Sequence, residues 1–334
     1  MTRRGPLRVA IVGAGLMGRW HARAAERAGG VVAVVIDADD ARGARLAAKY
    51  GARHTRSTAG IAGRSADSAG GVDVVHICTP LETHASLARA AIDVGAHALV
   101  EKPLTSTASE TAALLQHAEA RGVLLCPVHQ FLFQRGVRQV LAARTAIGPV
   151  LHVDAVACSA GGGDDGEAAR DRIAADILPH PLSLFTAVLD QPVAGFSWSV
   201  QRTCAGELRA SAAAGNATVS LLVSMSGRPT ANSLRVIAAR GTAHADLFHG
   251  FAVVERGNVS RVRKITHPFA FAGAMLDAAS ENLARRALAR ETAYPGLSSL
   301  VAAFYAAARG EAPPPISPAQ TLDVAQARDA VLAR

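Results

Sequence analysis

The sequence is poor in lysine and aromatic residues, and its basic residues form no cluster. Of 35 basic residues only Lys49, Lys102 and Lys264 are lysines, and the arginines are scattered along the 334 residues. Nucleic-acid-binding proteins gather basic residues in a patch or stripe, so the net charge of +8 is interpreted as solvated surface that mildly attracts anions. No apolar run reaches the length of a membrane span. Neither nucleic acid nor a membrane is therefore expected as a partner.

Cysteine is also scarce, and its spacing suggests no site. Cys78, Cys126, Cys158 and Cys204 lie far apart, without a C-x-x-C pair. Isolated buried thiols in a cytoplasmic protein are the expected state, and no metal site is predicted. The arginines at positions 3 and 4 precede only a short, glycine-broken apolar run, which does not fit a signal peptide. We therefore expect a cytoplasmic protein.

An apolar run at 9–12 ends abruptly in Gly13, Gly15 and Gly18, and helix-forming residues follow at 19–28. A strand, a glycine turn and a helix form the setting in which G-x-G-x-x-G indicates a dinucleotide site. Gly13 permits the tight turn, Gly15 lets the backbone approach a pyrophosphate, and Gly18 lets the helix pack on the strand. The amides at the helix start face the phosphates. A purely structural α/β turn is the alternative.

The second apolar run, 31–36, ends in Asp37. A carboxylate at this point accepts hydrogen bonds from an adenosine ribose and repels a 2′-phosphate, which favours NAD. Arg42 follows closely and could meet a 2′-phosphate, so NADP remains possible.

A chain of 334 residues is long enough for two domains. Residues 1–128 alternate strands and helices, which predicts a doubly wound parallel sheet. From about 149 strand candidates follow one another without a crossover helix, which predicts a mostly antiparallel sheet. We predict an α/β protein with a Rossmann domain at 1–128 and a substrate-binding and oligomerisation α/β domain with an open sheet at 129–334. Because such sheets often pair between subunits, a homodimer or homotetramer is expected.

The expected elements can be given by range. In the first part, strands are expected at 9–12, 31–36, 72–77, 97–100 and 123–127, and helices at 19–28, 41–50, 84–94 and 109–121. In the second part, a strand is expected at 149–158, a flexible loop at 159–167, a helix at 182–189, strands at 193–203, 207–214, 217–226, 233–239, 242–248, 251–256 and 259–265, and helices at 272–290, 297–309 and 319–332.

Two short segments at strand ends are candidates for chemistry. Thr79 and Pro80 follow the strand at 72–77, where a loop should border the cofactor. Glu101, Lys102 and Pro103 follow the next strand, and the proline keeps Lys102 from beginning a helix. A lysine beside a nicotinamide donates a hydrogen bond to a substrate oxygen and favours a developing alkoxide. An ordinary surface lysine is the alternative.

A second cluster is D-I-L-P-H-P at 176–181. Its two prolines argue against one helical face for Asp176 and His180, so we expect a helix to begin near Pro181, with Asp176 in the lead-in and His180 at the helix mouth. Histidine is a suitable acid or base for interconverting an alcohol and a ketone. His180 is, however, only one of 12 histidines.

These motifs, in this order, resemble the glucose–fructose oxidoreductase and inositol dehydrogenase family, Gfo/Idh/MocA, over nearly the full length. The carrying pieces are G-A-G-L-M-G, Asp37, V-D-V-V-H-I-C-T-P, G-A-H-A-L-V-E-K-P-L and D-x-x-x-H-P. The resemblance implies hydride transfer on a sugar, cyclitol or related polyol. It implies that Lys102 binds the reacting oxygen, His180 exchanges its proton, and Asp176 orients the substrate or the imidazole. The residues it implies along the cofactor are Gly13, Gly15, Leu16, Met17, Gly18, Asp37, Thr79, Pro80, His84, Glu101 and Lys102.

The chain departs from the family's pattern after the fifth strand. Where members commonly carry Asn-Arg-Arg-Phe, this chain has H-Q-F-L-F at 129–133, which predicts a less charged substrate edge. We predict an NAD-preferring oxidoreductase. A non-catalytic dinucleotide-sensing or scaffold protein of the same fold is the main alternative, and the E-K-P strand end disfavours an S-adenosylmethionine methyltransferase.

Overall fold

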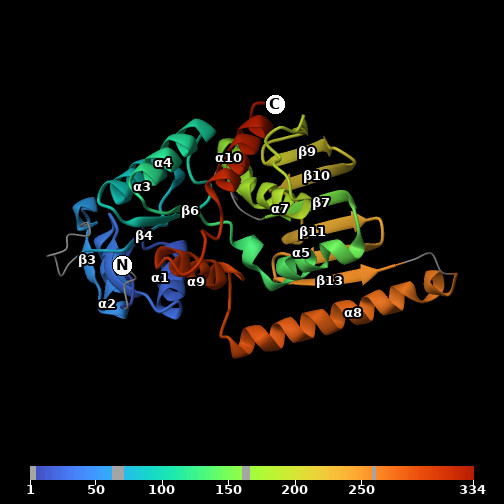
Figure 1. Cartoon of the computed structure of the whole chain (residues 1–334), viewed down its shortest axis with the longest axis horizontal. Helices are drawn as coiled ribbons and strands as arrows, with labels where there is room; N and C mark the ends of the chain where they lie inside the picture. Colours follow the sequence, from blue (N-terminus) through green and yellow to red (C-terminus); the bar gives the residue numbers. More distant parts are fainter. Residues whose placement is uncertain (1–4, 62–70, 160–165, 258–260) are drawn as a thin grey trace. The chain divides into compact units, whose positions relative to one another are not determined.

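The structure is a computed structural model, and it describes residues 5–61, 71–159, 166–257 and 261–334. The chain forms two compact units (Figure 1). The first contains the residues up to Val128 together with Leu297–Gln326, and the second contains His129–Gly296 and Ala327–Arg334. Within the described ranges, no helix combines the length and apolar character that crossing a bilayer requires.

The first unit is built on a six-stranded parallel sheet in the order β3-β2-β1-β4-β5-β6. Its central strands are almost wholly buried, as expected for a sheet covered by helices on both faces. The predicted doubly wound Rossmann sheet is confirmed. The strands are β1 (Arg8–Val12), β2 (Val31–Ile36), β3 (Arg53–Thr55), β4 (Val74–Ile77), β5 (His97–Val100) and β6 (Leu125–Pro127), and the helices are α1 (Leu16–Arg27), α2 (Asp40–Tyr50), α3 (His84–Asp93) and α4 (Ala108–Ala120).

Local signals set the ends of these helices. Asp39 caps α2 by accepting the amide of Arg42, and Gly51 ends it in the left-handed conformation. Thr107 and Glu110 form a reciprocal capping box at the start of α4. Each helix therefore begins and ends close to the predicted residue.

A late segment of the chain completes the first unit. Helix α9 (Leu297–Ala308) packs against α1 (Figure 1). Phe304 and Tyr305 of α9 are fully buried, and a Cβ on Gly30 would lie 2.8 Å from the Tyr305 ring. The sequence analysis had assigned this segment to 129–334 by chain order. The division by function, into a cofactor part and a substrate part, stays a prediction.

The second unit contains a seven-stranded sheet in the order β13-β12-β11-β7-β10-β9-β8. Only the β7–β10 pair is parallel, so the prediction of a mostly antiparallel sheet is confirmed. Burial alternates along β9 and β10, so one face of the sheet is buried there and the other is exposed. Helices α5, α6 and α7 pack on the sheet, and α8 packs against β13. The strands are β7 (Val150–Cys158), β8 (Ser199–Gln201), β9 (Glu207–Ala214), β10 (Ala217–Ser224), β11 (Ala231–Ala238), β12 (Gly241–Asp246) and β13 (Phe251–Arg256). The helices are α5 (Arg135–Ile147), α6 (Glu167–Ile177), α7 (Pro179–Leu189) and α8 (Arg261–Leu288), and α10 (Pro318–Leu332) begins in the first unit.

Several predictions for the second unit were wrong. Helices α5 and α6 were not expected, and the strand predicted at 193–203 is reduced to β8. Gly136 weakened the helical pattern of α5. It is retained because a Cβ there would collide with the backbone of Phe251. Residues 261–265, predicted to be a strand, begin α8, where Val262 and Ile265 have helical spacing. Residues 62–70 and 258–260, and residues 160–165 of the expected loop, lie outside the described ranges.

The cysteines also differ from the expectation. Cys126 is buried, but Cys78 and Cys158 are half-buried and Cys204 is exposed, and all four are free thiols. The expectation of uniformly buried thiols was therefore wrong.

Candidate dinucleotide and substrate sites

The fold itself requires two of the three fingerprint glycines. Gly13 has φ +91°, and a Cβ there would lie 2.5 Å from the carbonyl oxygen of Cys78. A Cβ on Gly18 would overlap the carbonyl oxygen of Gly13. Gly13 lets the turn pass close to the residue that follows β4. Gly18 lets the start of α1 pack directly against the carbonyl of Gly13.

Gly15 differs, because nothing inside the protein requires a glycine there. Its φ is −66°, and a Cβ would meet no atom within 4 Å. As the N-cap of α1 it supplies no side-chain acceptor, and the first turn contains no acidic residue. The amides of Leu16, Met17 and Gly18 lie in the first turn, which has no intrahelical acceptors for such groups. An open approach to these amides fits the pyrophosphate of a dinucleotide.

Asp37 lies at the end of β2 beside this turn, with 6% of its surface exposed. Oδ2 accepts the amide of Ala14 at 2.6 Å, and Oδ1 accepts that of Asp39 at 2.8 Å. The guanidinium of Arg42 donates to both oxygens, at 3.0 and 3.2 Å. Burial raises the pKa of Asp37, but Arg42 and the two amides outweigh this effect and hold the pKa below its ordinary value. Asp37 is therefore a carboxylate whose outer partner is a half-exposed arginine.

His84 joins the loops that follow β4 and β5. It is buried, with Nδ1 2.8 Å from the carbonyl oxygen of Pro103 and Nε2 2.8 Å from that of Thr79. The hydroxyl of Thr83 donates to Thr79 and to the carbonyl of Pro80. His84 thus holds together the two strand ends that carry Thr79 and Lys102. Its predicted contact with the cofactor stays a prediction.

Glu101 and Lys102 point to different surroundings at the end of β5. Glu101 is buried and Lys102 is half-buried. One oxygen of Glu101 lies 3.0 Å from Nε2 of His21 on α1, and the other accepts the amide of Lys102 at 3.2 Å. Glu101 therefore links the backbone of Lys102 to His21 on α1, the helix that follows the glycine turn. The sequence analysis missed His21, although it stands three residues after Gly18 on the fingerprint helix.

His180 is the second residue of α7 in the second unit, so its expected place at a helix mouth is confirmed. It is 7% exposed and stacks on Phe131, with ring centroids 4.1 Å apart and an interplanar angle of 17°. The sequence analysis treated Phe131 only as an apolar replacement in the 129–133 segment. The structure makes it the aromatic partner that fixes the plane of the imidazole.

Asp176 precedes α7, as expected, but this lead-in is itself helical. It is part of α6, which ends at Ile177, one residue before α7 begins at Pro179. The prolines therefore separate two helices, because proline at a first helical position is compatible with a new start. Asp176 is partly exposed and lies 4.0 Å from the guanidinium of Arg328.

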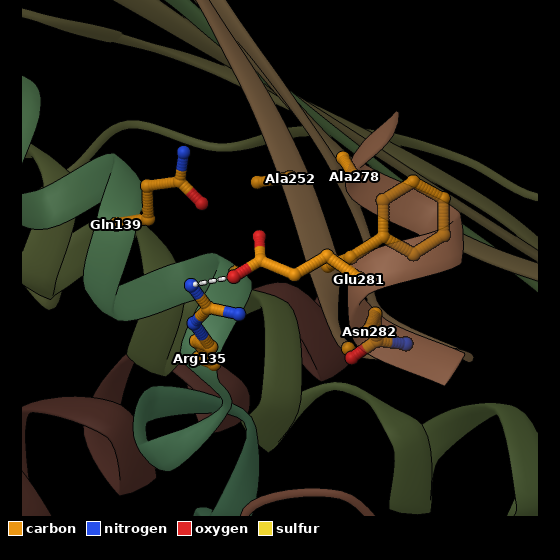
Figure 2. A pocket seen from close by; sticks show the side chains of 9 residues that line it. Arg135, Gln139, Ala252, Ala278, Glu281 and Asn282 are labelled. Atoms are coloured by element: carbon orange, nitrogen blue, oxygen red, sulfur yellow. Dashed lines mark hydrogen bonds and ion pairs between the residues drawn. The ribbon is translucent and has the colours of Figure 1, made fainter. Parts of the chain in front are cut away.

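One pocket in the second unit lies away from the predicted site residues. Its volume is about 80 Å³, and Figure 2 shows it between α5, β13 and α8. Arg135 donates to Glu281 across it at 2.9 Å, so each charge is compensated. The pocket is a seam between elements rather than an anion site. It is lined by Arg135, Gly136, Gln139, Gly250, Phe251, Ala252, Ala278, Glu281 and Asn282. Among the described residues, no group of three or more histidine, cysteine or acidic side chains could hold a metal ion.

Comparisons with known proteins agree with this geometry. The chain is 32% identical over 146 residues to a 4-carboxy-2-hydroxymuconate-6-semialdehyde dehydrogenase from Sphingobium, covering 41% of this chain and 45% of the relative. It is 37% identical over 120 residues to inositol 2-dehydrogenase 1 from Saccharopolyspora erythraea, covering 35% and 34%. Each match thus spans less than half of the curated relative.

The likeness in fold extends over the whole chain. The UDP-N-acetylglucosamine 3-dehydrogenase GnnA from Acidithiobacillus ferrooxidans has a TM-score of 0.73, at 20% identity, over 98% of both chains. Residues 7–129 match the family model described as the oxidoreductase family with an NAD-binding Rossmann fold, GFO_IDH_MocA. The resemblance seen in the sequence is confirmed for residues 7–129, which match this family's NAD-binding Rossmann domain.

Proposed function

We propose that the protein is an NAD(P)-dependent oxidoreductase that transfers hydride between the nicotinamide and a hydroxyl or keto carbon of a sugar, cyclitol or related polyol. The observation that carries the proposal is the open approach at Gly15 to the first turn of α1, beside a buried carboxylate at Asp37. Support for the substrate class comes from the inositol and UDP-N-acetylglucosamine dehydrogenases named above.

Each proposed residue has one task. The amides of the α1 first turn bind the pyrophosphate, and Asp37 binds the adenosine ribose. The bound nicotinamide supplies the hydride acceptor or donor. Lys102 donates a hydrogen bond to the reacting oxygen and stabilises its negative charge. His180, held flat by Phe131, takes the hydroxyl proton during oxidation, and Asp176 orients the substrate or the imidazole.

The experiment compares Lys102→Ala with Lys49→Ala, a second lysine of the same unit. NADH binding is followed by the fluorescence of Trp20 on α1, and turnover by reduced-nicotinamide absorbance in a screen of polyols and sugars. Lys102→Ala should lower turnover by about 100-fold or more while NADH affinity changes little. Lys49→Ala should change neither. Equal loss of binding and turnover in Lys102→Ala would contradict the catalytic role.

The same screen separates the main alternative. A dinucleotide-sensing or scaffold protein would bind NADH and oxidise none of the polyols or sugars. Failure to bind NADH or NADPH in the folded protein would overturn both proposals. A cytoplasmic location is part of the same proposal.

We also propose that the protein is a homo-oligomer and that a second copy covers α8. Val262, Ile265, Phe269, Leu276 and Leu283 are 68% to 81% exposed. Four of these five recur every seven residues, so they follow one side of the helix. The opposite side faces β13, where His267 lies 3.1 Å from Glu255.

These exposed apolar residues form a stripe on α8. The stripe is complementary to itself when the α8 helices of two copies pack antiparallel. With Ala272 of one copy opposite Leu276 of the other, Phe269 faces Ala279 and Ile265 faces Leu283. In two of these pairs a large side chain faces an alanine, and in the third two large side chains meet, along a 28-residue helix of about 42 Å. Light scattering measures the mass in solution. Phe269→Asp should shift the mass toward that of the monomer. Ala270→Asp, at an exposed residue beside the stripe, should leave the mass unchanged. An unchanged mass for Phe269→Asp would exclude this surface.

A further inference from the structure

Four polar side chains form a continuous buried chain inside the first unit. The Tyr305 hydroxyl lies 2.9 Å from Nε2 of His76, and Nδ1 of His76 lies 2.9 Å from Nδ1 of His21. Nε2 of His21 lies 3.0 Å from Oε1 of Glu101. Oε2 of Glu101 accepts the amide of Lys102. The chain therefore runs from α9, through β4 and α1, to the backbone of the lysine proposed to bind substrate.

Counting protons gives the chain a direction. The three hydrogen bonds between the four side chains need three hydrogens when Glu101 is ionised. The Tyr305 hydroxyl supplies one, and each neutral imidazole supplies one. Tyr305 then donates to Nε2 of His76, His76 donates from Nδ1 to His21, and His21 donates from Nε2 to the carboxylate. Every hydrogen in the chain then has an acceptor.

The alternative protonation state has one more proton, which is carried by His21. An imidazolium at His21 would donate in both directions, so His76 would have to donate to Tyr305 instead. The tyrosine hydrogen would then need a second acceptor. Among the residues that the structure describes, His76 is the only hydrogen-bond partner recorded for the Tyr305 hydroxyl. A buried donor without an acceptor is unfavourable, so the arrangement with two neutral rings is preferred.

The environment favours the same protonation. His76 and Tyr305 are completely buried and Glu101 nearly so. Burial lowers the pKa of His76 well below its ordinary value. Burial raises the pKa of Glu101, but the hydrogen bond from His21, the charge of Lys102 and the Lys102 amide bring it below its ordinary value. A neutral His76 and an ionised Glu101 are what the one-way chain needs.

We propose that Tyr305, His76 and His21 are positioning residues for Lys102, and that they act by holding Glu101 as an oriented carboxylate against the lysine's backbone amide. The role of Lys102 in turnover rests on the function proposed above. The direction of the chain does not rest on it.

The first test measures the direction in the cofactor-free protein by NMR of protein labelled with ¹⁵N in histidine. Nitrogen shifts and couplings distinguish the tautomers of the imidazole. Near neutral pH, His76 should carry its hydrogen on Nδ1 and His21 on Nε2. A doubly protonated His21, or a hydrogen on Nε2 of His76, would overturn the proposal. This measurement involves no reaction, so its failure is distinguishable from failure of the oxidoreductase proposal.

The second test removes one hydroxyl. Tyr305→Phe keeps the buried ring and deletes the first donor, whereas Tyr50→Phe makes the same change in the same unit at a hydroxyl with no recorded hydrogen-bond partner. Tyr305→Phe should change the His76 nitrogen shifts and lower kcat about tenfold, with the KM for NAD nearly unchanged. Tyr50→Phe should do neither.

Equal losses in the two variants, or a Tyr305→Phe enzyme with unaltered His76 shifts and full kcat, would contradict a positioning role. A rise in the KM for NAD with unchanged kcat would also contradict it, because that would place the effect on cofactor binding. Circular dichroism of both variants checks that each is folded.

Discussion

Arg42 lies across the carboxylate of Asp37, with its Nη2 3.0 Å from Oδ1 and its Nε 3.2 Å from Oδ2. With the amides of Ala14 and Asp39, it occupies the acceptor positions that a ribose would use. Its side chain is 49% exposed, so it can leave without disturbing the core. We therefore expect the balance between NADH and NADPH binding to depend on where this guanidinium lies.

We expect Arg42→Ala to bind NADH more tightly and NADPH about fivefold more weakly. The reason is that Asp37 is freed to accept ribose hydroxyls and its charge then repels the 2′-phosphate. Trp20 fluorescence titration measures both affinities. Arg45→Ala removes an exposed arginine from the same helix and should leave the ratio unchanged. The same ratio in both variants would show that Arg42 does not set the preference.

The fingerprint glycines should separate stability from binding. Gly18→Ala places a methyl group on the Gly13 carbonyl and should lower the free energy of unfolding by about 3 kcal/mol or more. Gly15→Ala meets no protein atom and should lower it by about 1 kcal/mol at most. Its NADH affinity should nevertheless fall roughly tenfold, because the methyl group projects into the approach to the α1 amides. Thermal unfolding and Trp20 titration give the two readings.

Acid should destabilise the first unit through His76. Its pKa in the folded protein lies well below the 6.5 of a free imidazole. Below about pH 6.5 the unfolded chain binds a proton that the folded chain excludes, so stability falls as pH falls, by up to about 1.4 kcal/mol per pH unit. Thermal unfolding between pH 8 and 5 should show a shallower slope in His76→Asn than in the wild type. A slope in His76→Asn as steep as in the wild type would contradict this role for His76.

Phe131 should affect turnover through His180. Phe131→Leu keeps an apolar side chain but removes a stacked ring contributing about 0.5–1.5 kcal/mol, which corresponds to a loss of roughly two- to tenfold in kcat/KM. NADH affinity should stay unchanged because Phe131 belongs to the second unit. Phe133→Leu in the same short segment, where the ring lies under Arg138, is the matched control. Equal effects of the two changes would argue against a role for the stack.

The sequence predicted the first unit closely because its signals are local. Gly13, Gly18 and the left-handed Gly51 stand where the backbone needs them, and buried parallel strands read as continuous apolar runs. The second unit was less predictable, because tertiary contacts override local preference there. Gly136 lies inside α5 only because Phe251 leaves no room for a side chain, a reason that no sequence window contains.

The candidate sites followed the same rule. Gly15, Asp37 and Lys102 were recognisable because each stands beside a motif. The buried side chains that lead to Glu101 were not, because His21 is 80 residues from Glu101 and His76 is 229 residues from Tyr305. Phe131 was also missed, since only the fold brings its ring onto His180.

The placement of α9 has a consequence for the order in which the protein is made. During synthesis the six strands of the first unit are complete once Pro127 has been added, yet α1 still lacks the helix that packs on it. His76 and the apolar surface that receives Phe304 must wait while residues 129–296 of the second unit are translated. The first domain to begin folding is therefore also among the last to finish, and a fragment ending at Val128 would keep the cofactor fingerprint but expose an unfilled groove to aggregation.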